Sequence, residues 1–294
     1  MLTITNLNKT YNNGVKALNQ VNLSIDSGLF GLLGPNGAGK SSLMRTIASL
    51  QGVDSGEIIF AGNSVLDKPQ QLRNQLGYLP QEFGVYPRVS AFNLLDHFAV
   101  LKGITNKSER HQQVSALLEQ TNLTDAREKS VSTFSGGMRQ RFGIAQALLG
   151  DPKLIIVDEP TAGLDPEERN RFHQLLSQLG QDRVVILSTH IVEDVSELCP
   201  NMAVLVDGEI LLQGKPSDLI DSLKGKVWKK NISPEQEQLF RDNFKVISIR
   251  LSAGQRCIHV LSEQQPEADF ELVEPDLEDV YFSVLYQQRN KIAA

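Results

Sequence analysis

The sequence predicts an α/β fold in which helices cover both faces of a parallel sheet. Nearly continuous apolar runs at 29–33, 154–157 and 184–187 are typical of strands that are buried on both sides. Segments with helical spacing alternate with these runs, because apolar residues recur every three or four positions over 43–50 and 168–180. Alternation of buried strands with helices favours a parallel sheet over an antiparallel one.

Two subdomains are expected around this core. Residues 2–5 and 21–25 alternate apolar with polar side chains, which is typical of half-buried antiparallel strands and predicts an N-terminal β subdomain. From about residue 82 to residue 150 the strand patterns disappear. Helical patterns there occupy 93–101, 107–120 and 138–149. We therefore expect a helical subdomain inserted into the α/β core.

A change of composition after Gly214 predicts a second, smaller domain. Just before it, Asp207-Gly208 lies between two apolar runs and predicts a hairpin with a type I′ turn. Beyond it, the patterns predict a strand, a helix over 234–243, a strand pair joined around Ala253-Gly254 and a closing helix from about Leu277. We expect one domain over 1–220 and a small α+β accessory domain over 221–294.

Composition and charge exclude several classes of protein. Hydrophobic residues make up 40% of the chain and charged residues 22%, a balance that excludes collagen-like and low-complexity chains. The 35 acidic residues outnumber the 29 basic ones, whereas nucleic-acid binding is typical of basic chains. No apolar run approaches the roughly 20 residues that cross a bilayer, the first residues lack signal-peptide features, and Cys199 and Cys257 form no CxxC pair. We expect a cytoplasmic protein that binds no nucleic acid.

A glycine-rich segment after the first apolar run is the strongest chemical signal. It fits the Walker A pattern between a predicted strand and a predicted helix, which is the context that this pattern requires. Its residues are Gly34, Pro35, Asn36, Gly37, Ala38, Gly39, Lys40, Ser41 and Ser42. Backbone N–H groups of such a loop surround phosphates, and we expect Lys40 to reach the β- and γ-phosphates and the Ser41 hydroxyl to ligate Mg²⁺. The segment predicts a phosphate-loop NTPase core.

Two acids at the end of the 154–157 run complete this predicted site. Asp158 and Glu159 follow a buried parallel strand, whose carboxyl end is where such a fold places the acid on the Mg²⁺ side. We expect Asp158 to orient the metal through water and Glu159 to polarise the attacking water. These two motifs alone leave kinases, GTPases, helicases and transport ATPases open.

The segment between the two motifs distinguishes among these families. Ser135, Gly136 and Gly137 precede a predicted helix, and a hydroxyl with free N–H groups at a helix start suits an anion. Phe-Ser-Gly-Gly-Met-Arg-Gln at 134–140 resembles the signature motif of ABC-type ATPases, in a variant common among one-domain exporter ATPases. The resemblance covers about 1–220.

Four further segments match motifs of the same family in the same order. Gln81 resembles the Q-loop glutamine, which touches Mg²⁺ or water, and His190 resembles the switch histidine, which contacts the γ-phosphate. Residues 163–166 resemble the D-loop, which crosses the dimer interface, and Asp165 also predicts a helix N-cap. Tyr11 matches the aromatic residue that stacks on adenine.

The resemblance implies an ATPase that works as one half of a dimer. In the family two such domains pair head to tail, so the signature segment 135–137 would contact the partner's ATP. Lys40, Glu159 and His190 would act on the chain's own ATP, with Ser41, Gln81 and Asp158 on Mg²⁺. The implied partners are an integral membrane transporter subunit and a second ATPase subunit, either a copy of this chain or a different one.

The end of the chain bears on what the energy is used for. Residues 274–281 resemble a Pro-x-Leu-Glu-Asp-Val-Phe segment near the C-terminus of many ATPases of drug, lantibiotic and sodium exporters, which favours an exporter over an importer. The aromatic segment 83–88 is expected near the groove that receives the membrane subunit, at the inner face of the membrane. A soluble ABC ATPase acting in a non-transport process is the alternative, and no residue indicates a transported substrate.

Overall fold

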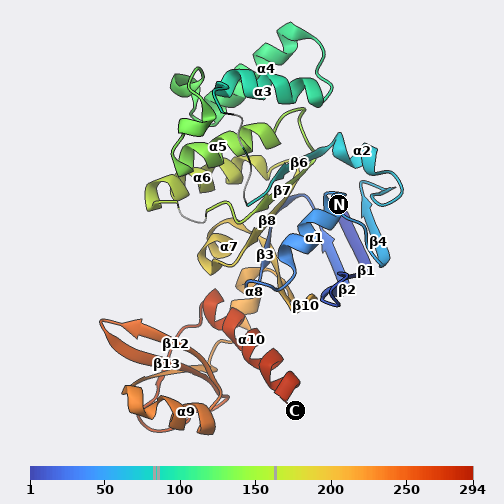
Figure 1. Cartoon of the computed structure of the whole chain (residues 1–294). Helices are drawn as coiled ribbons and strands as arrows, with labels where there is room; N and C mark the ends of the chain where they lie inside the picture. The colour runs from blue at the N-terminus through green and yellow to red at the C-terminus, as the bar shows by residue number, and fades with distance from the viewer. Residues whose placement is uncertain (82–83, 85–86, 162–163, 294) are drawn as a thin grey trace. The chain divides into compact units, whose positions relative to one another are not determined.

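The computed structural model of the chain describes residues 1–81, 84, 87–161 and 164–293 (Figure 1). Parts of the expected groove segment 83–88 and of the D-loop segment 163–166 therefore lie outside the described residues, namely Phe83, Val85, Tyr86 and Gly163. The chain forms two compact units, Met1–Ile210 and Leu211–Ala294. Each unit has a sheet and a buried apolar cluster of its own.

A six-stranded sheet has the order β10-β9-β3-β8-β7-β6, in which the strands from β9 to β6 belong to the first unit and β10 begins in that unit and ends after Ile210. The strands span Gly28–Leu33 (β3), Leu76–Leu79 (β6), Leu154–Asp158 (β7), Val184–Thr189 (β8), Asn201–Val206 (β9) and Glu209–Gly214 (β10). The five strands from β9 to β6 pair in parallel, and every residue of β7 and β8 is buried. The expected parallel sheet is confirmed.

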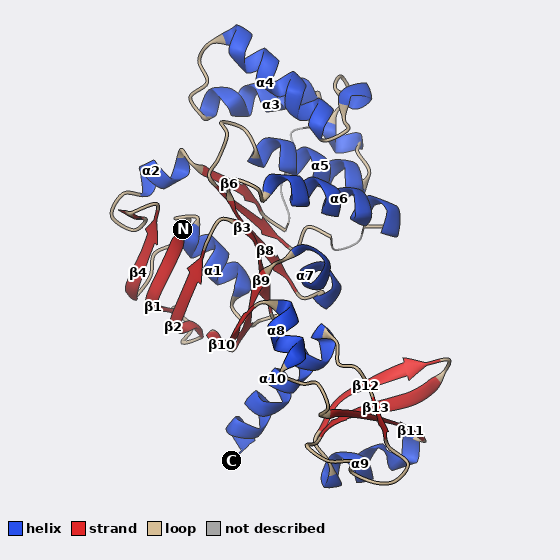
Figure 2. Cartoon of the chain, turned by 180° about the vertical axis from the view of Figure 1, so that it is seen from behind, coloured by secondary structure: helices blue, strands red, loops and turns tan. Residues whose placement is uncertain are grey.

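Helices cover both faces of this sheet, as Figures 1 and 2 show with α1 on one side and α7 on the other. They are α1 (Lys40–Ile47), α2 (Pro69–Arg73), α6 (Pro166–Leu179) and α7 (Val192–Leu198). On the α7 side the packing is close, because a Cβ at Gly31 would lie 2.7 Å from a methyl group of Val195. The helix expected through Leu50 is shorter than predicted: Ser49 turns into the left-handed region with φ of 56°, which leaves Leu50 exposed.

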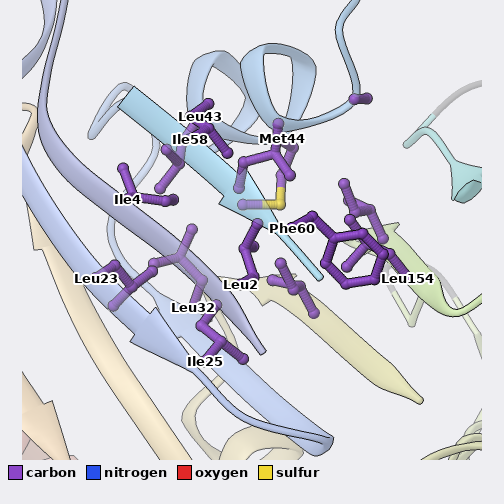
Figure 3. Packing of buried hydrophobic residues seen from close by; sticks show 14 of the residues in the cluster. Leu2, Ile4, Leu23, Ile25, Leu32, Leu43, Met44, Ile58, Phe60 and Leu154 are labelled. Atoms are coloured by element: carbon purple, nitrogen blue, oxygen red, sulfur yellow. The ribbon is translucent and has the colours of Figure 1, made fainter. Parts of the chain in front are cut away.

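A four-stranded antiparallel sheet, β2-β1-β4-β5, confirms the expected N-terminal β subdomain. Its strands are β1 (Leu2–Thr10), β2 (Lys16–Ile25), β4 (Ser55–Phe60) and β5 (Asn63–Ser64). Figure 3 shows how its inward side chains, such as Leu2, Ile4 and Ile58, meet Leu43 and Met44 of α1. This shared core ties the start of α1 to both sheets.

The expected helical insert follows β6. It contains α3 (Ala91–Leu101), α4 (Lys107–Gln120) and α5 (Gly136–Ala147) with two 3₁₀ turns, and the described residues between β6 and β7 include no strand. The N-cap residues of these helices are Ser90, Asn106 and Ser135, whose side chains accept hydrogen bonds from backbone N–H groups of the first turn. None of the helices in the described ranges combines the length and the apolarity that a bilayer crossing requires.

The second unit is an α+β module, as predicted. It contains α8 (Pro216–Asp221), β11 (Val227–Ile232), α9 (Glu237–Asn243), β12 (Val246–Ser252), β13 (Gln255–Leu261), β14 (Glu271–Leu272) and α10 (Leu277–Ala293). The strands form an antiparallel sheet in the order β12-β13-β11-β14 around a core that includes Phe240, Ile258 and Phe270. In the first unit, the predicted type I′ turn is confirmed, since Asp207 and Gly208 have φ of 49° and 79°.

The two leucines near α1 provide a matched test of this packing. Leu43 is fully buried beneath both sheets, whereas Leu50 is 59% exposed. We expect Leu43→Ala to lower the free energy of unfolding by about 2–5 kcal/mol, because it leaves a cavity, and Leu50→Ala to change it by less than about 0.5 kcal/mol. Urea unfolding followed by circular dichroism measures both, and equal losses would contradict the packing described.

Candidate functional site

The glycine-rich loop connects β3 to α1 at the carboxyl edge of the parallel sheet, where α/β folds bind ligands. Two of its glycines are required by close approach of other backbone. A Cβ at Gly34 would lie 2.2 Å from the carbonyl oxygen of Leu205, and one at Gly39 would lie 2.3 Å from that of Ala17. Gly39 also has φ of 105°, a conformation that only glycine adopts freely.

A cavity of about 610 Å³ opens beside this loop. Predicted site residues that line it are Tyr11, Asn36, Gly37, Gly39, Lys40, Ser41, Ser42, Gln81 and Glu159. Four further lining residues were not predicted for the site: Val15, Lys16, Ala17 and Asp207, the last of which was predicted only as a turn residue. These additional residues come from β2, from the turn before it and from the β9–β10 turn, and none belongs to a nucleotide-binding motif. Only the pairing of distant segments reveals them.

Lys40 is the buried cation of the cavity, with only 5% of its surface exposed. Its Nζ donates to the carbonyl oxygens of Gly34 at 2.8 Å and Pro35 at 3.1 Å, and lies 3.5 Å from Oε1 of Glu159. Burial lowers the pKa of Lys40, and the negative charge of Glu159 opposes that shift. In this arrangement the ammonium group is held by the loop's own carbonyls and by an acid.

Glu159 is the point where three predicted side chains meet. Gln81 Nε2 donates to its Oε2 at 3.2 Å, and His190 Nδ1 and Lys40 Nζ lie 3.3 and 3.5 Å from its Oε1. Its backbone is left-handed, with φ of 49°, and its N–H donates to the carbonyl of Ser188. Unfavourable backbone geometry of this kind is typical of functional sites.

One carboxylate oxygen of Asp158 accepts no hydrogen bond from the residues that the structure describes. Its side chain is 3% exposed, and Oδ1 is buried with no hydrogen-bond partner among the described residues. A buried carboxylate oxygen without a partner is costly unless a ligand or water completes it. Carboxylate and hydroxyl oxygens are the ligands that Mg²⁺ prefers, so Asp158 together with Ser41 fits a site for this ion.

Tyr11 is held in place by Gln51, which the motifs did not predict. Its Oη lies 2.9 Å from Oγ of Ser42 and donates to Oε1 of Gln51 at 3.1 Å. The amide group of Gln51 in turn donates to the backbone carbonyl of Ser42 at 2.8 Å. Gln51 lies outside every motif, so no sequence signal points to it.

The signature segment does not line this cavity. Ser135 and Gly136 are exposed, and Ser135 Oγ accepts a hydrogen bond from the N–H of Met138 as the N-cap of α5. Gly137 is buried against α6, where a Cβ would lie 2.6 Å from Oε2 of Glu168. In the D-loop segment, Asp165 caps α6 by accepting from the N–H of Glu168 at 2.8 Å, as predicted.

Comparisons with known proteins agree with this geometry. The profile of the ABC transporter family matches residues 18–162. The ABC transporter ATP-binding protein YhaQ of Bacillus subtilis is 33% identical over 298 residues, which cover 96% of this chain and 97% of the relative. This chain belongs to the ABC transporter ATP-binding proteins. The Nod factor export ATP-binding protein I of Cupriavidus metallidurans is another of these proteins, 34% identical over 245 residues, with 81% of this chain and 80% of the relative covered.

Other members of the ABC family differ from this chain in length. ABC transporter A family member 8 of Dictyostelium discoideum is 37% identical to this chain over 223 residues. The match covers 74% of this chain but only 26% of the relative. Among solved structures, a dimeric post-hydrolysis state of the ATP-binding cassette MJ0796, bound to ADP and Pi, is similar with a TM-score of 0.67 and 28% identity. That match covers 73% of this chain and 98% of the cassette, so this chain has the ABC ATPase fold.

Two glycines of the ABC phosphate loop test its local geometry. Gly37 and Gly39 both have positive φ, but only Gly39 faces backbone, whereas a Cβ at Gly37 would meet nothing within 4 Å. We expect Gly37→Ala to cost about 1–2 kcal/mol of stability from the left-handed backbone alone, and Gly39→Ala to cost clearly more. Urea unfolding compares the variants, and a smaller loss in Gly39→Ala would contradict the described contact with Ala17.

Proposed function

We propose that this chain is the ATP-binding and ATP-hydrolysing subunit of a membrane ABC transporter, in particular of an exporter. The observation that carries the proposal is the cavity in which Lys40, Ser41 and Glu159 meet at the carboxyl edge of the sheet. Its volume of about 610 Å³ lies in the range of small-molecule sites. A buried ammonium, hydroxyl groups and a helix start are the groups that bind a triphosphate.

The loop and α1 would hold the phosphates. Helix α1 begins at Lys40 with no side-chain cap and no acid in its first turn, so its first N–H groups and the positive end of its dipole are available to an anion. Lys40 would exchange the carbonyl oxygens of Gly34 and Pro35 for phosphate oxygens. Tyr11, which Gln51 and Ser42 hold at the cavity wall, would stack on adenine.

Mg²⁺ would be bound on the side of Ser41 and Asp158. The buried, unpartnered Oδ1 of Asp158 would complete its hydrogen bonding through a metal-bound water, and Gln81 would lie at the rim of the same site. When bound, the ion neutralises charge on the β- and γ-phosphate oxygens. The residues therefore fit the ATP and Mg²⁺ that the family implies.

Glu159 is the group that we assign to the attacking water. Its carboxylate lies within 3.5 Å of both Lys40 Nζ and His190 Nδ1, so it is close to the position where a γ-phosphate would lie. In-line hydrolysis requires a water held opposite the leaving oxygen by a proton acceptor. Lys40 and His190 would stabilise charge on the transferred group, and Gln81 would hold the Glu159 carboxylate in place.

The exposed signature segment supports a dimer. Ser135 and Gly136 present a hydroxyl and a helix start to solvent, away from the chain's own cavity. In a head-to-tail dimer these groups, with Gly137, would contact the partner's ATP. Each ATP would then belong to the interface, so binding would favour the closed dimer and hydrolysis would reopen it.

A groove of about 400 Å³ in the first unit is the surface that we assign to the membrane subunit. It is lined by residues of the segment after α1, of the end of α3 and of α2, β6 and α5, and they include Leu50, Phe98 and Leu101. Leu101 is 70% exposed, and exposed apolar side chains around a groove are typical of protein interfaces. The name of the Nod factor export relative supports an exporter. Binding to the membrane subunit would place the chain at the cytoplasmic face of the membrane.

Substitution of Glu159 tests the assigned chemistry. We expect Glu159→Gln to bind ATP with unchanged or higher affinity, to lose about 10²–10⁴-fold in turnover because the proton acceptor is gone, and to accumulate as a dimer with ATP. Lys40→Ala should instead weaken ATP binding itself. Calorimetry, a phosphate-release assay and gel filtration measure the three properties, and wild-type turnover in Glu159→Gln would refute its role.

Capture of the membrane partner tests the transport assignment. Tagged Glu159→Gln chain, incubated with ATP and Mg²⁺ in detergent-solubilised membranes of its own source, is expected to retain a multi-span membrane protein, identified by mass spectrometry. Leu101→Glu should abolish capture, while Leu251→Glu, which alters a similarly exposed leucine of the second unit, should preserve it. Recovery of only soluble or ribosomal partners would favour the non-transport alternative and leave the ATPase chemistry in place.

A further inference from the structure

Asp194, whose carboxylate is completely buried, lies outside the cavity but contacts segments that carry residues of the candidate site. Asp194 is on α7, four positions after His190, and its side chain has no exposed surface. Burying an isolated carboxylate is very costly, and such a group persists only where other groups compensate its charge and satisfy its oxygens. The groups that contact Asp194 therefore show which segments its carboxylate holds together.

Both oxygens of Asp194 are engaged by other segments of the chain. Oδ1 accepts from Nε of Arg169 at 2.8 Å and lies 2.9 Å from Nε2 of His173. Oδ2 accepts from the hydroxyl of Thr161 and, at 3.4 Å, from that of Thr189. One carboxylate thus connects the segment after β7, the end of β8 and the first turns of α6.

Two of these segments, the one after β7 and the end of β8, carry a group of the candidate site. Thr161 lies two residues after Glu159, and Thr189 directly precedes His190. The Thr189 hydroxyl also accepts a hydrogen bond from the N–H of Ile191 at 3.0 Å, so the backbone is held on both sides of His190. The Thr189 carbonyl accepts from the N–H of Gly34 at 3.3 Å, which joins the phosphate loop to the same point.

We infer that Asp194 is a positioning residue that holds Glu159 and His190 at the separation their contact requires. The inference rests on the proposed ATPase function for its effect on turnover, but the arrangement itself is a property of the ligand-free chain. Asp194 is not among the residues that line the cavity, and it acts through Thr161 and Thr189. Loss of its charge would release both segments, and the 3.3 Å contact between His190 Nδ1 and Glu159 Oε1 would lengthen.

Two variants remove this connection to different degrees. Asp194→Asn keeps the shape but replaces one accepting oxygen with an N–H₂ donor, which cannot satisfy both Arg169 and the two hydroxyls. Thr161→Val keeps the size and removes a single donor. Asp96→Asn is the matched control, because it removes a carboxylate that Arg110 Nε contacts at 2.6 Å in the helical insert, far from His190 in sequence and outside the cavity.

The first measurement needs no ATP. The chain contains five histidines, so ¹⁵N-labelled imidazoles give a simple spectrum in which His190→Gln identifies the His190 signals. We expect these signals to shift in Asp194→Asn and in Thr161→Val and to stay in place in Asp96→Asn. Unchanged His190 signals in both of the first two variants would overturn the inference.

The second measurement separates positioning from binding. We expect Asp194→Asn to lose about 10²-fold in kcat, the effect of a misplacement of about 1 Å at a catalytic group, with ATP affinity within about twofold of wild type. Thr161→Val should also lower kcat, by a smaller factor than Asp194→Asn. A kcat no lower than in Asp96→Asn, or an equal loss of affinity and kcat, would overturn the inference.

The two measurements also keep this inference apart from the proposed function. If the wild-type chain hydrolyses no ATP, the proposed function fails, while the His190 signals still decide whether Asp194 positions that residue. If Asp194→Asn does not fold, Thr161→Val decides both measurements, since it deletes one hydroxyl and no charge. A shifted His190 signal with lowered kcat and retained affinity supports the inference.

Discussion

The rest of the structure depends on the register of three neighbouring parallel strands. β8 lies between β3 and β7, with Leu33 opposite Thr189 and Asp158 opposite Ser188, so the three carboxyl ends coincide at one edge. The glycine-rich loop follows β3, Asp158 is the last residue of β7 with Glu159 next to it, and His190 follows β8. Because parallel strands all point the same way, residues more than 100 positions apart converge without any long loop.

Two buried aspartates of the first unit contrast in how their charges are satisfied. Asp194 is enclosed by Arg169, His173 and two threonine hydroxyls, so its oxygens are fully occupied. Asp158 is almost as buried, yet one oxygen has no partner among the described residues. The first arrangement holds segments together, whereas the second leaves capacity for a ligand. The left-handed backbone of Glu159 is unfavourable, and such a conformation persists only where the surrounding contacts hold it in place.

The proposed dimer follows from the separation of the cavity from the signature segment, because a second chain is needed to bring a signature segment to each cavity. Lys40 and Glu159 face one another within the chain, while Ser135 presents its helix start to solvent. Glu168 and Arg141, 3.3 Å apart, connect α6 to α5 behind the buried Gly137. Since α6 also carries Arg169, the helix that follows the D-loop touches both the signature helix and the residue that we infer to position His190.

Local spacing and runs of one residue class along the sequence were enough to predict the parallel sheet, the helical insert and the glycine-rich loop between β3 and α1. The sequence also placed Asp158, Glu159 and His190 at strand ends, and strand ends of a parallel sheet share one edge. Tertiary structure alone decided that Gln51 fixes Tyr11, that Asp194 joins three segments and that Leu50 lies outside α1. These outcomes depend on which distant atoms meet, and pairing across the fold leaves no periodic signal along the chain.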